Sequence, residues 1–378
     1  MELKQICVIG AGDMGHGIAE VCAIGGYTIK LYDIKQEMLD SALKRILKSL
    51  KVLKRKRKIR KESLDQILQR IEPTLDIGSA VSDSMLIFEA APEIKDLKRE
   101  LYQKIQPFLR EDAVIATNTS YLSINSLSQD LENPDRFIGC HFFNPVVLQK
   151  VVELNYTPKT SEDTLLLLEE VMENIGKKSV RVKDSPGFVL NRIQIAPQVL
   201  VSRLYQQGII KPEEVDALMK NKGLPLGAFE TMDYVGLDVT LHGMKYMGSV
   251  LGEEYGPPSW LVELVDQGHL GRKTGRGVYD WSSGHANIDL GAKTDVLDTL
   301  DLLITEINEA MKLLEENVVE SKKDIDKVMK LGSGNPLSLF GLLKGVGKEK
   351  CVARCEHFAE LLGFSMFKPV KTLKNWEN

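Results

Sequence analysis

A short glycine-rich segment constrains the fold of this chain more than any other feature of the sequence. Residues 4–9 form an apolar run that predicts a buried strand, and residues 14–25 have helical character before a second apolar run, 28–33. Glycines between a strand and a helix permit a tight turn, close approach of a pyrophosphate and helix-to-strand packing. The segment therefore predicts a dinucleotide-binding βαβ unit, whose cofactor contacts are Gly10, Ala11, Gly12, Asp13, Met14 and Gly15.

An acidic residue ends the second predicted strand. Asp33 follows Gly15 by eighteen residues, about the distance at which a carboxylate binds the adenosine ribose hydroxyls. Such a carboxylate disfavours the 2′-phosphate of NADP, so NAD is the predicted cofactor, although Lys35 two residues further on weakens this preference. The alternative is a glycine-bearing loop without a ligand, which the flanking strand and helix disfavour.

The rest of the chain changes character part of the way along. Strand-like runs at residues 85–90, 113–118 and 137–141 alternate with helical stretches, which predicts a parallel sheet with crossover helices. Residues 184–187 then break the pattern with a proline in a helix-entry position, and a long helical pattern begins at Phe188.

A second boundary is predicted in the Gly-, Ser- and Ala-containing stretch 284–293. The expected fold is an α/β Rossmann-type domain followed by two all-α helical domains, at residues 1–183, 184–290 and 291–378.

The two helical domains are predicted to be an internal repeat. Val215-Asp-Ala-Leu-Met-Lys220 aligns with Ile325-Asp-Lys-Val-Met-Lys330 at an offset of 110 residues. Pro225, Phe229 and Gly236 recur as Pro336, Phe340 and Gly347 at an offset of 111, so one residue is inserted between the two blocks. This many matches in one register favours duplication over chance similarity.

Four further segments carry a resemblance to a known family. They are Asn118-Thr-Ser120, Arg136-Phe-Ile-Gly-Cys-His141-Phe-Phe-Asn144-Pro145, Val151-Val-Glu153 and Ser185-Pro-Gly-Phe-Val-Leu-Asn191-Arg192. Together with their spacings they closely resemble the signatures of the L-3-hydroxyacyl-CoA dehydrogenase family over most of the chain. The resemblance implies NAD-dependent oxidation of a 3-hydroxyacyl-CoA, such as 3-hydroxybutyryl-CoA, or the reverse reduction.

The resemblance makes His141 and Glu153 the catalytic pair, and the chemistry agrees. Oxidation of a secondary alcohol needs a base for the hydroxyl proton, and an unperturbed imidazole titrates near neutral pH. An imidazolium in a dry pocket needs a carboxylate to orient it and to stabilise its charge. The alternatives are a hydrogen-bonded core histidine and a glutamate on the solvent face of an edge strand.

Ser120 and Asn191 are implied at the oxygen atoms of the substrate, and Ser120 also contacts the CoA ester. Asn191 falls within an apolar helical stripe, where a buried amide needs a partner. Its alternative role is a hydrogen bond between helices, and Ser120 alternatively caps the helix that follows it.

The family pattern also implies further cofactor contacts, each of which is alternatively a surface or capping residue: Glu93, Lys98, Asn118, Asn144 and Lys273.

A basic helix is the predicted binding site for the phosphates of coenzyme A. Residues 44–61 contain eleven Lys or Arg and no acid, in a chain whose net charge is −4. Leucine and isoleucine recur there at helical spacing, which predicts one apolar face and a cationic remainder. Lys54, Lys56 and Lys58 are the proposed phosphate contacts, and a plain solvated face is the alternative. Nucleic-acid and membrane binding are disfavoured, because aromatic residues do not interleave the basic ones.

The remaining expectations concern metal, compartment and assembly. Five cysteines without a CxxC pair predict neither a metal site nor disulfides. No apolar run has the length of a membrane helix, and the chain is interpreted as cytoplasmic. The second helical copy is expected to be non-catalytic and to pack on the first, giving a monomer with pseudo-dimeric repeats or a homodimer.

Two rival functions stay open at this stage. One is a dehydrogenase of the same fold that acts on a small hydroxy acid or sugar acid. The other is a non-catalytic scaffold that binds NAD, which predicts loss of the catalytic residues.

Overall fold

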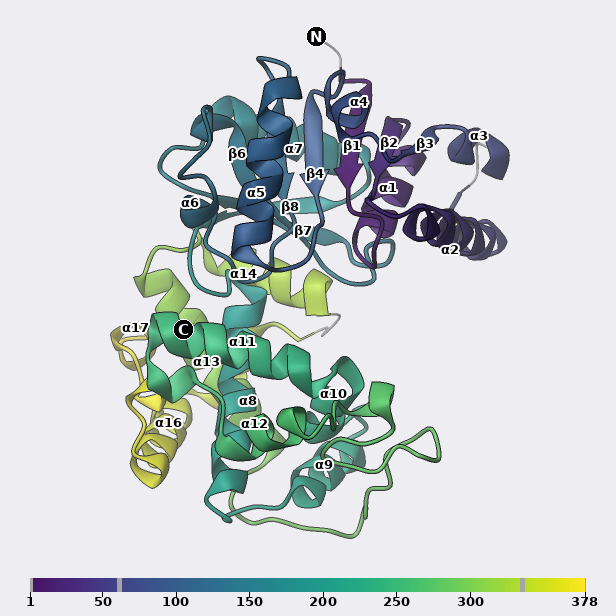
Figure 1. Cartoon of the computed structure of the whole chain (residues 1–378). Coiled ribbons are helices and arrows are strands. Elements are labelled where there is room, and N and C mark those ends of the chain that lie inside the picture. Colours follow the sequence, from purple (N-terminus) through teal and green to yellow (C-terminus); the bar gives the residue numbers. More distant parts are fainter. Residues whose placement is uncertain (1–2, 60–62, 334–336, 378) are drawn as a thin grey trace. The chain divides into compact units, whose positions relative to one another are not determined.

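The computed structural model describes residues 3–59, 63–333 and 337–377 (Figure 1). By internal packing the chain divides into two compact units, Met1–Phe188 with Val318–Pro336 and Val189–Asn317 with Leu337–Asn378. This division differs from the three predicted domains, 1–183, 184–290 and 291–378. No helix of the described residues is long and apolar enough to cross a membrane.

An eight-stranded sheet, in the order β3-β2-β1-β4-β5-β6-β7-β8, forms the centre of the first unit. The strands are β1 (Gln5–Ile9), β2 (Thr28–Tyr32), β3 (Ile71–Thr74), β4 (Leu86–Glu89), β5 (Val114–Thr117), β6 (Phe137–Phe142), β7 (Val151–Tyr156) and β8 (Lys178–Lys183). The predicted parallel sheet is confirmed from β3 to β6, whereas β6 and β7 pair antiparallel. Because β8 covers the far side of β7, β7 is an interior strand.

Helices cover this sheet, and their apolar faces supply its core. They are α1 (Gly15–Ile24), α2 (Gln36–Arg55), α3 (Leu64–Leu68), α4 (Ile77–Val81), α5 (Lys95–Ile105), η1 (Gln106–Phe108), α6 (Ile124–Leu127), η2 (Pro134–Arg136) and α7 (Glu162–Asn174). The basic helix α2 buries Leu39, Ala42, Ile46, Leu50 and Leu53, a spacing of three and four residues that places them on one stripe. The predicted amphipathic basic helix is therefore present.

Among its described residues, the second unit forms helices joined by irregular segments, with isolated β-bridges at Gly271–Arg276 and Arg276–Asp280. It contains α8 (Leu190–Gln206), α9 (Pro212–Asn221), α10 (Ala228–Val235), α11 (Leu237–Leu251), η3 (Glu253–Tyr255), α12 (Ser259–Asp266), η4 (Arg272–Thr274), α13 (Thr299–Glu315), α15 (Leu339–Val346), α16 (Lys348–Leu362), η6 (Ser365–Phe367) and α17 (Lys371–Lys374). The helix predicted from Phe188 begins at Leu190, because Gly187 and Phe188 both adopt positive φ, at 73° and 54°.

The internal repeat is visible element by element. The succession α10, glycine, α11 and η3 recurs as α15, glycine, α16 and η6. Gly236 and Gly347, which the sequence aligned, each separate two helices with φ of 118° and 87°. A side chain is disfavoured at such positive φ, which explains why glycine recurs at both positions. The matching residue Pro336 lies outside the described residues.

The second copy is divided between the two units. Its helix α13 packs against α8, as the sequence predicted. Its next helix, α14 (Lys322–Val328), and the following π-turn η5 (Met329–Ser333) instead pack on β7 and β8 of the first unit. The expectation that the second copy packs on the first copy is therefore wrong for this segment, whose apolar residues Ile325, Val328 and Met329 are buried with the sheet unit.

Candidate active site

His141 and Glu153 form a directly bonded pair in the first unit. The antiparallel register of β6 and β7 places the two residues opposite each other. His141 Nδ1 lies 2.7 Å from Glu153 Oε2, and the glutamate is completely buried. Because the strand beyond β7 covers it, Glu153 does not lie on the solvent face of an edge strand. A buried carboxylate without a cationic or hydrogen-bonding partner is costly, and the imidazole meets that requirement.

Two aromatic rings hold the imidazole in place. The ring of Phe143 meets it edge to face at a centroid distance of 4.7 Å, and the ring of Phe188 lies at 5.6 Å. Since Glu153 occupies Nδ1, Nε2 is the ring nitrogen that remains for exchange of a proton with a substrate. If the imidazole is neutral and donates its proton to Glu153 through Nδ1, Nε2 carries the free lone pair that the predicted role of base requires.

Ser120 lies in a loop after β5 that a single carboxylate organises. Oε1 of Glu93 accepts hydrogen bonds from Thr119 Oγ1 at 2.6 Å, from the Ser120 amide at 2.8 Å and from the Tyr121 amide at 2.9 Å. Ser120 is half-buried, and the side chain that caps the next helix, α6, is Ser123 instead. Burial raises the pKa of Tyr121 to about 12, so the phenol stays neutral at physiological pH.

Asn118 connects this loop to the catalytic strand. Its Oδ1 accepts the backbone N–H of Phe142 at 2.9 Å, directly after His141. The amide side chain therefore fixes the end of β5 relative to β6, and it also lines the pocket described next.

The glycine-rich turn fits the backbone requirements of a dinucleotide. A Cβ on Gly10 would lie 2.6 Å from the carbonyl oxygen of Ala90, and one on Gly15 would lie 1.7 Å from that of Gly10. Nothing lies within 4 Å of the corresponding position on Gly12, which leaves that backbone open to a ligand. Gly10 and Gly15 thus have the tight turn and close packing that the sequence predicted, and the approach of a pyrophosphate at Gly12 stays a prediction.

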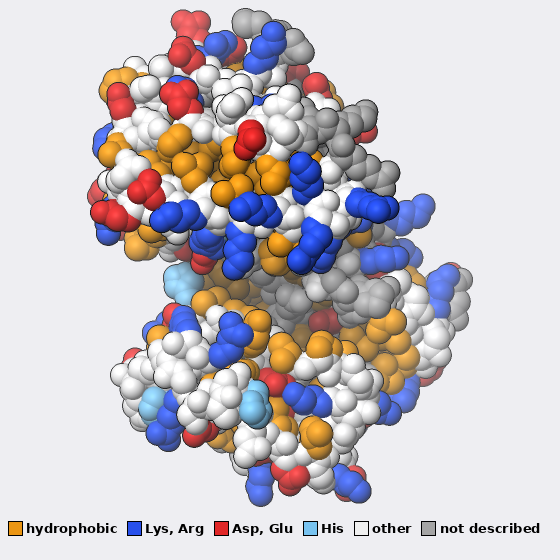
Figure 2. Space-filling model, turned by 90° about the vertical axis from the view of Figure 1, so that its right-hand side faces the viewer, with side chains coloured by type: hydrophobic (Ala, Val, Ile, Leu, Met, Phe, Trp, Pro, Cys, Tyr) orange, Lys and Arg blue, Asp and Glu red, His pale blue; other side chains and the backbone are white. Residues whose placement is uncertain are grey.

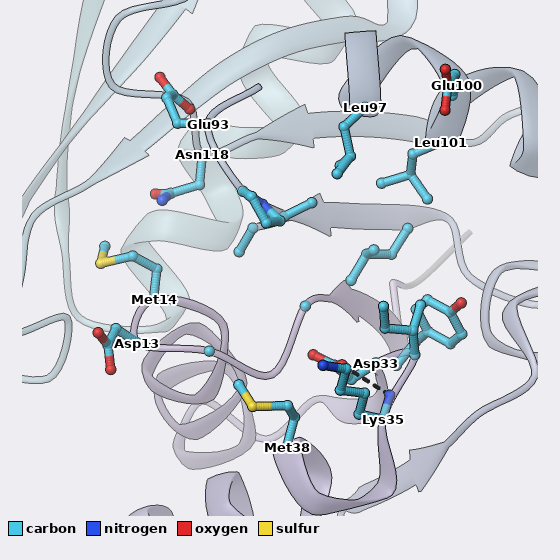
Figure 3. Close-up of a pocket in the computed structure, with 18 of the residues that line it drawn as sticks. Asp13, Met14, Asp33, Lys35, Met38, Glu93, Leu97, Glu100, Leu101 and Asn118 are labelled. Carbon is cyan, nitrogen blue, oxygen red and sulfur yellow. Dashed lines mark hydrogen bonds between the residues drawn. The ribbon is translucent and has the colours of Figure 1, made fainter. Parts of the chain in front are cut away.

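Asp33 is anchored beside the turn. Its carboxylate accepts the Ala11 amide at 2.8 Å and the Lys35 amide at 3.1 Å. Both bonds hold the negative charge at the end of β2, where it faces the pocket (Figure 3). A 2′-phosphate brought to this position would meet an anion fixed by two backbone donors.

A cavity of about 790 Å³ extends from the glycine turn. Its lining includes eight of the predicted residues, namely Gly10, Gly12, Asp13, Met14, Asp33, Glu93, Asn118 and Ser120. In Figure 3, Met38 from α2 and Leu97 and Leu101 from α5 border the same pocket as Asp33. These apolar residues were not predicted. The position of Met38, five residues after Asp33, was a signal in the sequence, whereas Leu97 and Leu101 are brought there only by the fold.

Lys98 does not line this cavity. Its ammonium group is buried, 2.6 Å from Glu89 Oε1, and it also donates to the carbonyl of Ala91 at 3.1 Å. Tyr102 and Thr117 donate to the other oxygen of Glu89. Where a cofactor contact was predicted, the structure places a buried ion pair beneath the loop that leads to Glu93.

The other predicted site residues occupy several places. Asn144 is exposed after β6, before a cis bond to Pro145. Asn191 lies in the first turn of α8 in the second unit and is half-buried. The apolar stripe predicted burial unless the residue served a ligand. Lys273 belongs to η4 of the second unit and forms an ion pair with Asp238 at 2.5 Å. The roles of all three in binding stay predictions.

The basic residues of α2 and of the turn after it are exposed. Lys54 lies in the last turn of the helix, and Lys56 and Lys58 follow it, all three open to solvent. Figure 2 faces the side of the molecule on which α2 lies and shows Lys and Arg side chains gathered over this part of the first unit. Arg60 and Lys61, at the end of the predicted basic run, lie outside the described residues.

Comparison with known proteins identifies the relatives of this arrangement. The family model described as the NAD binding domain of 3-hydroxyacyl-CoA dehydrogenase matches residues 5–185. The model of the C-terminal domain of the same family matches two segments, 187–281 and 301–376, which agrees with the internal repeat.

Individual relatives match over long stretches. The mitochondrial hydroxyacyl-coenzyme A dehydrogenase of Sus scrofa is 38% identical over 74% of this chain and 91% of its own length. A probable 3-hydroxybutyryl-CoA dehydrogenase of Bacillus subtilis is 35% identical over 74% of this chain and 98% of its own. The crystal structure of 3-hydroxybutyryl-CoA dehydrogenase from Escherichia coli K12 superimposes with a TM-score of 0.86 at 26% identity, covering 99% of this chain and 98% of that one.

Proposed function

The chain belongs to the 3-hydroxyacyl-CoA dehydrogenase family, and from that premise we propose that it interconverts an (S)-3-hydroxyacyl-CoA and the 3-oxoacyl-CoA, with NAD as the redox partner. The observation that carries the proposal is the buried His141–Glu153 pair, bonded at 2.7 Å across two interior strands of the sheet that carries the glycine-rich turn. A short-chain substrate such as 3-hydroxybutyryl-CoA is the first candidate, as the names of the relatives suggest.

The residues of the first unit fit NAD. The open backbone at Gly12, the helix N-terminus after it and the anchored carboxylate of Asp33 would hold the pyrophosphate and the adenosine ribose. When bound, NAD supplies the acceptor for the hydride that leaves C3. Asp33 favours NAD over NADP, because its fixed charge lies where the extra phosphate would be.

In the proposed mechanism, His141 and Glu153 accept and stabilise the proton that the substrate loses. Nε2 of His141 takes the proton of the C3 hydroxyl as the C3–H bond breaks, so the carbonyl forms and one proton remains on the imidazole. Glu153 fixes the ring through Nδ1 and stabilises the imidazolium. Ser120, held by Glu93 through its amide, and Asn191 are assigned to the substrate oxygens, as the family motif implies.

Coenzyme A is the proposed source of binding energy away from the reaction centre. Its phosphates carry negative charge, and exposed lysines at positions 54, 56 and 58 are the proposed contacts. A substrate acid without coenzyme A leaves these cations without a ligand.

The assembly and the compartment are also proposals. The second helical copy supplies α13 as a partner for α8 within one chain, which supports a monomer. A dimer formed through α8 in sedimentation velocity would contradict this. Five buried cysteines without a disulfide support a reducing compartment, the cytoplasm.

The test is the absorbance at 340 nm while purified protein consumes NADH with acetoacetyl-CoA, repeated with NADPH and with free acetoacetate. We expect oxidation that requires both NADH and the thioester. Turnover of the free acid alone would support the rival small-acid dehydrogenase. Binding of NADH without turnover of either compound would support the scaffold.

A further inference from the structure

The second helical copy differs from the first at one helix end. The sequence offset between the copies changes from 110 to 111 residues between Lys330 and Pro336. In the first copy, α9 ends as an α-helix at Asn221. In the second copy, α14 is followed by the π-turn Met329–Ser333. A π-turn bonds residues five apart rather than four, and such turns are frequent at functional sites.

This π-turn packs on β7, the strand that carries Glu153. The Lys150 amide, just before β7, donates to the carbonyl of Leu331 at 3.4 Å. At the other end of the segment, the amide of Lys183 donates to the carbonyl of Val318 at 2.8 Å. Two backbone hydrogen bonds therefore tie this part of the second copy to the sheet that holds Glu153.

Gly332 lies beside Phe143 and Val151. A Cβ at this position would lie 3.1 Å from Phe143 Cε2 and 3.4 Å from Val151 Cγ1. Its backbone does not have positive φ, so the space that Phe143 leaves, and not the backbone conformation, is what requires glycine here. Phe143 is in turn 4.7 Å from the imidazole of His141, ring centre to ring centre.

The contact lies on the catalytic face of the sheet. Val151 precedes Glu153 by two residues on β7, so both side chains point to one face. A side chain at position 332, which is buried, would therefore press on Val151 and on Phe143, the residue whose ring packs against the imidazole.

We propose that Gly332, in the π-turn of the second helical copy, is a positioning residue for His141, acting through the ring of Phe143. The second copy, which has no catalytic residues of its own, thereby contributes to the site. The proposal rests on the proposed role of His141 as the base.

Gly332→Ala is the direct test. The new methyl group would shift Phe143 by a few tenths of an ångström and would turn the imidazole away from its position. Because small misplacements of catalytic groups are costly, we expect kcat with NADH and acetoacetyl-CoA to fall by about fivefold to tenfold. KM and the dissociation constant of NADH should stay within about twofold. The matched control is Gly345→Ala in α15, where nothing lies within 4 Å of the new Cβ.

A second readout does not depend on activity. The ring protons of His141 experience the ring current of Phe143, and their NMR signals can be assigned by their loss in His141→Gln. We expect Gly332→Ala to shift these signals and Gly345→Ala to leave them in place. Unchanged signals and unchanged kcat in Gly332→Ala would overturn the proposal. If the wild type fails to turn over the thioester, the proposed function fails, while the NMR comparison still decides this inference.

A variant of Phe143 tests the same contact independently, in case Gly332→Ala does not fold. Phe143→Leu removes the ring edge, and we expect it to lower kcat without changing KM. In the double variant Gly332→Ala/Phe143→Leu, the glycine change should have no further effect, because the atom it displaced is gone. Additive losses, or a Phe143→Leu variant with normal kcat, would also overturn the proposal.

Discussion

His141 and Glu153 join stability and chemistry in one contact. The glutamate is fully buried, so its charge needs the imidazole, and the imidazole needs the carboxylate when it takes up a proton. At the residue scale, therefore, Glu153 and His141 each depend on the other as a hydrogen-bonding partner. Phe143 and Phe188 pack against the ring, which is buried.

Replacement of His141 separates turnover from binding. His141→Gln keeps a polar side chain but removes the base, so kcat should fall by about 10² to 10⁴-fold. NADH binding, measured by fluorescence, should be unchanged, because the glycine turn and Asp33 are untouched. Near-normal turnover in this variant would show that the assignment of the base is wrong.

A second buried carboxylate predicts a pH-dependent stability. Burial raises the pKa of Glu20, in α1, to about 7, and the Ser49 side chain opposes the shift. The unfolded chain ionises this group near pH 4.5, whereas the folded protein resists ionisation. The contribution of Glu20 to the free energy of unfolding is therefore fully present below pH 4.5 and is lost as the pH rises through about 7.

Glu20→Gln should remove this dependence. We expect its melting temperature to exceed that of the wild type by about 5 °C at pH 8, with the difference disappearing toward pH 4.5. Glu37→Gln, at an exposed position of α2, is the control. A constant difference between Glu20→Gln and wild type over this pH range would contradict the assignment.

At the scale of elements, the loop after β5 is held by side chains rather than by regular backbone pairing. Glu93 accepts three hydrogen bonds from Thr119, Ser120 and Tyr121 through one oxygen. The buried pair of Lys98 and Glu89 lies beneath the segment that leads to Glu93. The loop that presents Ser120 thus depends on a carboxylate about 27 residues earlier in the sequence.

Glu93→Ala should loosen this loop. With three donors left without their acceptor, we expect kcat/KM for acetoacetyl-CoA to fall by about 10 to 100-fold, a loss of about 1.4 to 2.8 kcal/mol. Glu93→Gln retains an acceptor oxygen and should recover most of this loss. Equal losses in both variants would indicate that the charge of Glu93, and not its hydrogen bonds, is what matters.

At the scale of the whole molecule, the two helical copies share a buried charged cluster within the second unit. Arg192 of α8 donates to Glu309 of α13 at 2.5 Å, and Tyr255 and Lys312 also donate to Glu309. The carboxylate of Glu309 is therefore the shared acceptor of the hydrogen bonds that link the two copies. Arg192 also pairs with Glu316 at 3.0 Å, whose side chain is 44% exposed.

Removal of that carboxylate should be severe. Glu309→Ala leaves the buried Arg192 with only the exposed Glu316 and leaves Lys312 without a carboxylate, and we expect a loss of about 3 to 5 kcal/mol in the free energy of unfolding. Glu316→Gln, which alters the exposed pair, should cost less than about 1 kcal/mol. Denaturant titration of both variants gives the comparison, and similar losses would contradict a central role for Glu309.

The sequence by itself determined the parts that depend on local conformation and on residue type. The glycine-rich turn was predicted from local residue type. A Cβ would clash at Gly10 and Gly15, and the backbone at Gly12 is open to a ligand. The repeat could be detected in the sequence because corresponding helices have similar residue patterns, and because Gly236 and Gly347 both end a helix with positive φ. The family motif supplied His141 with Glu153 as partners.

The tertiary structure alone decided contacts whose members are distant in the sequence and share no pattern. Lys98 was predicted at the cofactor, but the packing of α5 on β4 places its ammonium group beside the buried Glu89. The sequence showed α14 as part of a repeat, yet its apolar face is buried on the sheet unit. Gly332 looks like any glycine until the fold brings Phe143 to within 3.1 Å of its missing side chain. Such contacts depend on strand register and side-chain packing, which result from interactions between segments distant in the sequence, so no local segment predicts them.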